Sequence, residues 1–135
     1  MPHIDCYFAT MSPYTYLCGL RPAEIARKYG ATITYKPLDI MALFARTGGV
    51  PPKDRHPNRQ AYRLQDLERR AKVAGLPLNV KPAFWPTNPA PSSFAIIAAQ
   101  NTGADVGGLV HAITRACWAE DRDISQDDVI RDCLK

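Results

Sequence analysis

The tetrapeptide SPYT at residues 12–15 combines residue types and spacing that could support chemistry. It follows a short apolar stretch, and the apolar residues Leu17 and Leu20 after it are spaced as on one face of a helix. Ser12 is therefore expected to cap a helix that starts at Pro13. One interpretation of this serine is that it only caps the helix. The other is that its hydroxyl, at the positive end of a helix, holds an anion such as a thiolate. Both interpretations are open at this point.

Two other reactions are disfavoured for this tetrapeptide. A thiol redox protein carries Cys-x-x-Cys at such a place, and neither Ser12 nor Thr15 can supply the thiolate that disulfide exchange needs. A serine hydrolase needs a base near its nucleophile, yet no Gly-x-Ser-x-Gly motif is near and the histidines are dispersed along the chain. The cysteines lack the short spacing of a metal site or a redox pair. We therefore expect reduced thiols and no metal at the four cysteines, Cys6, Cys18, Cys117 and Cys133.

Composition narrows the class of protein. The chain has 135 residues, 46% of them hydrophobic, which suits one globular domain with an ordinary core. Its formal charge of +4 comes from basic residues interleaved with acidic ones, so we expect no nucleic-acid partner. No apolar stretch approaches membrane-spanning length and the amino terminus does not read as a signal peptide. The expected location is the cytoplasm, with no membrane contact.

Local patterns predict a strand, a helix and a second strand in the first part of the chain. Alternating side chains predict a strand over residues 3–9, and helical spacing predicts a helix over 13–29, interrupted near Pro22. A second strand is predicted over 31–40, parallel to the first, and residues 48–58 are predicted to form a Gly- and Pro-rich loop.

The rest of the chain is predicted to be helical. Helices are expected over residues 59–74 and 105–119, another starting at a cap on Ser92 or Ser93, and a last one starting at Ser125 with Asp128 as a capping-box acid. Two parallel strands make too small a sheet to stand alone. The sequence therefore predicts that part of the sheet is missing from these 135 residues.

Four segments, in this order, resemble the 2-hydroxychromene-2-carboxylate isomerase family: YFATMSPYTYL, GATITYKPLDIMALFARTGGVPPKDR, YRLQDLERRA and WPTNPAPSS. That family is similar to the kappa-class glutathione transferases. The resemblance implies an α/β fold of the thioredoxin-like, DsbA-like type with an all-helical insertion. It assigns residues 1–45 to an N-terminal β-α-β part and residues 46–135 to the loop and helical insertion. The C-terminal strands that complete the sheet in the family are absent from this chain.

The resemblance also implies glutathione as the cofactor. In the family a serine replaces the first redox cysteine and holds the sulfur of glutathione, so Ser12 is the expected catalytic residue, with Ser12, Pro13 and Tyr14 binding the cofactor. The thiolate would add reversibly to a small aromatic enone or pyruvate-type substrate and permit cis-trans isomerisation, as in aromatic catabolism. No metal is implied.

Three further residues are expected to contact the substrate. Arg55 falls where the family has an amide-arginine pair and is a candidate for binding a carboxylate, although Asp54 departs from that pair. Trp85 falls where the family has an aromatic residue in the substrate pocket. Phe44 stands where the isomerases of naphthalene degradation have a lysine, which leaves the substrate open. The alternative interpretations are that Arg55 is only solvated and that Trp85 only packs against the core.

Other functions remain as alternatives to the isomerase. The chain could be a non-catalytic or truncated thioredoxin-like module that binds glutathione or another ligand, or a kappa-like glutathione transferase. A wholly helical interaction protein is a third hypothesis, which the two predicted strands disfavour. The family resemblance further implies a homodimer.

Overall fold

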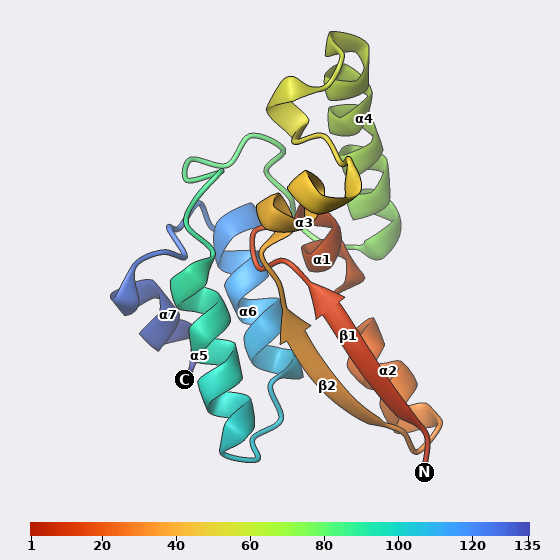
Figure 1. Cartoon of the computed structure of the whole chain (residues 1–135), viewed down its shortest axis with the longest axis vertical. Coiled ribbons are helices and arrows are strands. Elements are labelled where there is room, and N and C mark those ends of the chain that lie inside the picture. Colours follow the sequence, from red (N-terminus) through yellow and green to blue (C-terminus); the bar gives the residue numbers. More distant parts are fainter.

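Two parallel strands and a set of helices make up the fold, and the computed structural model describes all 135 residues (Figure 1). Seven α-helices and one 3-10 turn accompany the strands. In chain order the elements are β1 His3–Phe8, α1 Pro13–Cys18, α2 Arg21–Lys28, β2 Thr32–Pro37, α3 Ile40–Thr47, the 3-10 turn η1 Pro52–Asp54, α4 Pro57–Ala74, α5 Ala90–Asn101, α6 Gly107–Trp118 and α7 Asp127–Cys133.

The predicted parallel pairing of the two strands is confirmed. β1 pairs with β2 in a register that runs from His3 opposite Thr32 to Phe8 opposite Pro37. The rings of Phe8 and Tyr35 are buried and meet edge to face, 6.1 Å between centroids. His3 and Asp5, which alternate with the apolar positions of β1, are exposed. The two strands rule out the wholly helical alternative.

The predicted helix over residues 13–29 is two helices. α1 ends at Gly19, which adopts a φ of 55° and donates its N–H to the carbonyl of Tyr16. Glycine enters this positive-φ region without the steric cost that a side chain brings. Pro22 then lies in the first turn of α2, where its missing N–H would have had no helical partner. The break therefore comes from Gly19, and Pro22 helps to start the next helix.

Helix α3 was not predicted: residues 31–40 were assigned to one strand and residues 41–47 to no element. The strand β2 ends at Pro37, and Asp39 caps α3: its Oδ1 accepts hydrogen bonds from the N–H groups of Met41 and Ala42, both at 3.1 Å. Gly48 closes the helix with a φ of 75°. The polar cap and the terminal glycine are ordinary helix signals that the predicted strand overran or left unused.

The starts of two later helices differ from prediction. α5 begins at Ala90, ahead of the expected serine cap, and the Ser92 hydroxyl is buried and donates to Thr10 Oγ1 at 2.9 Å. α7 is preceded by Gln126 without any side-chain cap. The Ser125 hydroxyl instead donates to Asp123 at 2.7 Å. The expected capping box with Asp128 is therefore wrong.

A single core joins the strands to the helices. Tyr16, Ile96, Ile113 and Trp118 are completely buried, and they share one cluster with Phe8 and Tyr35. Helices α5 and α6 stand together beside the strands (Figure 1). No helix has both the length and the apolar character required to cross a membrane. The core thus contains residues from both parts of the division proposed at residue 45.

Asp123 provides a pH-dependent link in this fold. Its carboxylate accepts hydrogen bonds from the Ser125 N–H at 3.0 Å and hydroxyl at 2.7 Å, and from the Thr87 hydroxyl at 2.8 Å. The Ser125 backbone and side-chain bonds are the main causes that lower the pKa of Asp123 to about 2. Since this folded pKa lies below the unfolded value, the stabilisation is complete above about pH 4 and is lost as the pH falls toward 2.

Asp123→Asn should therefore lower the free energy of unfolding at pH 7, and its deficit relative to wild type should shrink as the pH falls from 4 to 2. Urea unfolding followed by circular dichroism at several pH values measures this difference. Asp127→Asn, which changes an exposed acid on α7, is the matched control. A deficit that stayed constant down to pH 2 would contradict the assigned role of the Asp123 carboxylate.

Candidate functional site

Ser12 occupies the expected cap position at the start of α1. Its Oγ accepts a hydrogen bond from the Thr15 N–H at 3.3 Å, a long bond, and its hydroxyl proton has no acceptor within the chain. The N–H of Tyr14 also has no partner within the chain, as is usual for the first turn of a helix. Pro13 is buried beneath this turn. A half-buried hydroxyl and one free amide therefore face the same end of α1, and both are donors suited to an anion.

The segment before Ser12 is held by the helical part of the chain. The Met11 carbonyl accepts two hydrogen bonds, from the indole Nε1 of Trp85 at 2.9 Å and from that of Trp118 at 3.2 Å. One residue earlier, the fully buried Thr10 hydroxyl accepts the bond from Ser92. Buried hydrogen bonds of this kind restrict the backbone to one arrangement. Residues from three later segments thus position Ser12.

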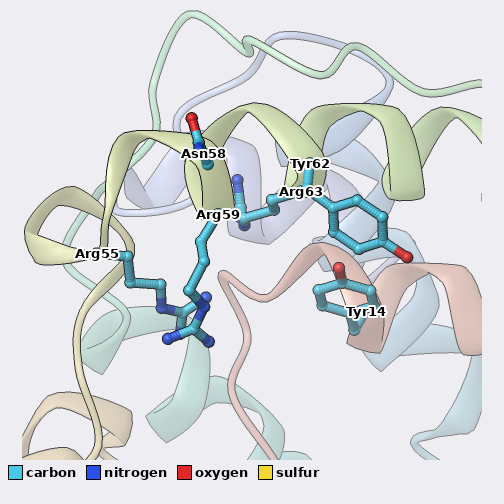
Figure 2. A pocket seen from close by; sticks show the side chains of 6 residues that line it. All are labelled: Tyr14, Arg55, Asn58, Arg59, Tyr62 and Arg63. Atoms are coloured by element: carbon cyan, nitrogen blue, oxygen red, sulfur yellow. The ribbon is translucent and has the colours of Figure 1, made fainter.

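A cavity of about 390 Å³ opens between α1 and α4 (Figure 2). Tyr14 projects toward it from α1. The other lining residues come from the first half of α4 and from Arg55, which directly follows η1. The whole lining is Tyr14, Arg55, Asn58, Arg59, Tyr62 and Arg63.

Asp66 fixes the Tyr14 side chain at the edge of this cavity. The Tyr14 hydroxyl donates to Asp66 Oδ2 at 2.9 Å, and Arg70 Nε donates to the same oxygen at 2.9 Å. The Arg70 bond and then the Tyr14 bond lower the pKa of Asp66, while burial and the Asp66 bond raise that of Tyr14. The carboxylate is therefore ionised at neutral pH and is already occupied by two donors.

The predicted substrate residues do not all meet at this cavity. Arg55 lines it, and only its Nε is occupied, by the Val50 carbonyl at 2.8 Å. Trp85 does not line it: it lies half-buried against Trp118, with ring centroids 5.4 Å apart, and holds Met11. Phe44 packs on α3 against Gly49, where any side chain would overlap the phenylalanine ring. The structure thus brings Tyr14 and Arg55 together at the cavity, and Ser12, Trp85 and Phe44 do not line it.

Sequence reasoning missed four residues of this lining, Asn58, Arg59, Tyr62 and Arg63. The signal that could have found the cluster is the spacing of four between Arg55, Arg59 and Arg63, since residues four apart share a helix face. Arg59 and Arg63 lie on α4, while Arg55 immediately follows η1.

Other chemistry finds little support in the structure. No group of three or more histidine, cysteine or acidic side chains is arranged to hold a metal ion. All four cysteines are free thiols. Burial raises the pKa of Cys117 to about 12, so this thiol is protonated at neutral pH and is a poor nucleophile.

The chain is similar in sequence to isomerases and to a kappa-class glutathione transferase. The chain is 31% identical to the 2-hydroxychromene-2-carboxylate isomerase of Pseudomonas putida over 118 residues, 87% of this chain and 56% of the relative. It is 34% identical to glutathione S-transferase kappa 1 of Caenorhabditis elegans over 85 residues, 62% of this chain and 37% of the relative. The chain therefore spans about half or less of the length of these curated relatives.

The fold matches solved structures as well. A structure of a 2-hydroxychromene-2-carboxylate isomerase superposes with a TM-score of 0.76 at 26% identity, covering 97% of this chain and 66% of that one. The family model described as the DSBA-like thioredoxin domain matches residues 3–135. The β1-α1-α2-β2 order and the parallel strand pair are compatible with a thioredoxin-like fold. The chain belongs to the DsbA-like thioredoxin domain family.

Proposed function

We propose that this chain carries the cofactor-binding end of a glutathione-dependent isomerase of the 2-hydroxychromene-2-carboxylate isomerase type, with Ser12 as its catalytic residue. The observation that carries the proposal is the Ser12 hydroxyl, whose proton lacks an acceptor, at the end of a firmly anchored loop. The similarity to named isomerases and to a kappa-class transferase supports it.

The donors around Ser12 fit a thiolate. The Ser12 hydroxyl and the Tyr14 N–H can both donate to one anionic sulfur, and Pro13 contributes no competing N–H. When bound, glutathione supplies a thiolate that adds reversibly to an activated alkene, so that the former double bond can rotate before the thiolate leaves. Donors that stabilise the thiolate favour its ionised form at neutral pH.

Other residues of the chain would orient the substrate. The terminal nitrogens of Arg55 have no partner within the chain, which suits a bidentate contact with a substrate carboxylate. Trp85 would act through the Met11 carbonyl by holding the Ser12 loop. In this proposal Phe44 offers an apolar surface to an aromatic ring that extends beyond the cavity. Small aromatic substrates, a cytoplasmic location and a homodimer complete the proposal.

Calorimetric titration of reduced glutathione into the wild-type chain and into Ser12→Ala tests the role of Ser12. Loss of one hydrogen bond to a charged sulfur corresponds to about 1.5–3 kcal/mol, so the variant should bind about 10- to 100-fold more weakly. The matched control is Ser93→Ala, a serine in the first turn of α5.

S-methylglutathione provides the second comparison, because it cannot form the thiolate. It should bind the wild type and Ser12→Ala with the same affinity. Equal binding of reduced glutathione by both proteins would contradict the assignment of Ser12.

A kappa-like transferase is the second candidate, and the identity of 34% to the Caenorhabditis elegans protein favours it. The two reactions differ in the fate of glutathione, which an isomerase returns and a transferase leaves attached to the product. Mass spectrometry of the products from an enone panel separates them.

A further inference from the structure

The cavity between α1 and α4 is strongly positive. Its six lining residues include three arginines and no acid. Arg59 and Arg63 form no hydrogen bond and no ion pair within the chain, and Arg55 donates only to a backbone carbonyl. Asp66, which follows on the same helix, is occupied by Tyr14 and Arg70. Like charges without a counterion repel one another, so an anion bound here relieves that repulsion.

Arg63 is the inner cation of this group. Its guanidinium lies over the rings of Trp85 at 4.9 Å and Trp118 at 5.9 Å from the centroids, which holds the side chain in place. Burial lowers the pKa of Arg63, and the charge of Arg55 lowers it further. A guanidinium remains charged under such a shift, so Arg63 is a half-buried positive charge without an acidic partner.

The other two cations form a separate anchor. Figure 2 shows the side chains of Arg55 and Arg59 pointing toward one another, while Arg63 projects from the next turn of α4. Arg59 is exposed and Arg55 is half-buried, so this pair lies nearer to solvent than Arg63 with its tryptophan contacts. The phenol rings of Tyr14 and Tyr62 line the same cavity. The cavity thus presents two cationic anchors and an aromatic wall.

We infer that this cavity selects an aromatic substrate with two ionised acid groups, one bound by Arg55 and Arg59 and the other by Arg63. The inference rests on the proposed function and narrows its substrate class from one carboxylate to two. A monoanion would leave one of the two anchors without a counterion, whereas a dianion gives each anchor an acceptor. Arg59 and Arg63 are then specificity-determining residues.

Simple aromatic acids test the inference by calorimetry at fixed ionic strength. Isophthalate and terephthalate carry two carboxylates and benzoate carries one. At least one of the dicarboxylates should bind the wild-type chain tenfold or more tightly than benzoate. Raising the salt concentration should weaken the binding of the dicarboxylate more than that of benzoate, because the dicarboxylate makes more charge contacts. Equal affinities for benzoate and both dicarboxylates would overturn the inference.

Variants locate the preference on the named residues. Arg63→Met and Arg59→Met should each remove most of the tenfold preference, while Arg63→Lys should retain part of it because the charge remains. Arg27→Met, which removes an exposed cation from α2, is the control and should keep the full preference. Circular dichroism verifies folding, and Arg59→Met with Arg63→Lys decides the question if Arg63→Met does not fold. An undiminished preference in Arg59→Met and Arg63→Met would contradict the inference.

Glutathione separates this inference from the proposed function. Glutathione that displaces the dicarboxylate competitively would assign the arginine cavity to the cofactor and overturn the inference. If the dicarboxylate preference is lost in the Arg59 and Arg63 variants but Ser12→Ala binds glutathione as tightly as wild type, the cavity assignment stands and the proposed function fails. If Ser12→Ala binds glutathione more weakly than wild type but benzoate binds as tightly as the dicarboxylates, the proposed function stands and the inference fails.

Discussion

Trp118→Ala should lower the free energy of unfolding by about 3–5 kcal/mol, the usual range when a large buried aromatic residue is truncated. The side chain is completely buried at the end of α6, packs against Trp85 and donates to the Met11 carbonyl. Truncation leaves a cavity in the shared core and removes one support of Arg63. Because a domain of this size is stable by about 5–15 kcal/mol, the loss is large enough to leave part of the protein unfolded. Urea unfolding followed by circular dichroism measures it.

Trp118→Phe separates the two contributions of this residue. The smaller ring keeps part of the packing but removes the indole N–H, so its loss should be smaller than that of alanine. The Met11 carbonyl retains the Trp85 donor at 2.9 Å. A loss below about 1 kcal/mol for Trp118→Ala would show that this region of the core relaxes around the missing ring, contrary to the expectation.

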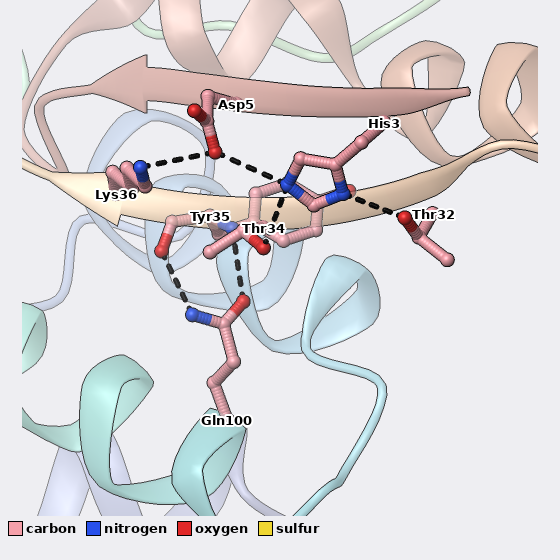
Figure 3. Close-up of polar contacts among 7 residues, drawn as sticks. All are labelled: His3, Asp5, Thr32, Thr34, Tyr35, Lys36 and Gln100. Atoms are coloured by element: carbon pink, nitrogen blue, oxygen red, sulfur yellow. Dashed lines mark hydrogen bonds and ion pairs between the residues drawn. The ribbon is translucent and has the colours of Figure 1, made fainter. Parts of the chain in front are cut away.

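Gln100→Met should also lower the free energy of unfolding strongly, because the Gln100 side chain hydrogen-bonds two backbone groups of β2. Gln100 Oε1 accepts the Tyr35 N–H at 2.9 Å, and its Nε2 donates to the Tyr35 carbonyl at 3.0 Å (Figure 3). Methionine has a similar volume but can make neither bond. Each buried backbone group left unpaired costs about 1–3 kcal/mol, and Tyr35 is only 5% exposed. Chemical denaturation should therefore show a loss of about 2 kcal/mol or more.

Two matched variants control this experiment. Asn101→Ala changes the exposed neighbouring amide on α5 and should leave stability within about 0.5 kcal/mol of wild type. Gln100→Glu keeps an acceptor for the Tyr35 N–H but loses the donor to the carbonyl when ionised, so it should recover stability as the pH falls and the acid protonates. Wild-type stability in Gln100→Met would show that water replaces the amide at this strand edge.

Gln100 also explains how a small sheet is completed on one side. The Tyr35 N–H and carbonyl that it binds face away from β1, because the pairing of the two strands occupies the other side of β2. An edge strand otherwise exposes such groups to pairing with another chain. α5 therefore protects the middle of the β2 edge through one side chain rather than through a third strand.

The locally encoded features are the ones that the sequence predicted well. The Ser12 cap, Pro13 at the first helical position and the strand-helix-strand order follow from cap chemistry and side-chain alternation over a few residues. The errors were local as well: the predicted strand was extended through residue 40, past the cap at Asp39, and Gly19 ended a helix that was predicted to be continuous to Pro22. In both cases the residue that ends one element or starts the next was present, but the predicted element was extended past it.

The site depends on contacts that no local pattern encodes. Met11 meets indoles 74 and 107 residues further along the chain, and Tyr14 meets Asp66 across 52 residues. The arginine spacing was visible in the sequence, but the packing of α4 beside α1 decides that Arg63 turns toward the tryptophans. By itself the sequence determined where a donor-bearing helix start lies. The tertiary structure alone decided which distant side chains anchor it and which charges surround it, because that choice depends on packing many helix faces together at once.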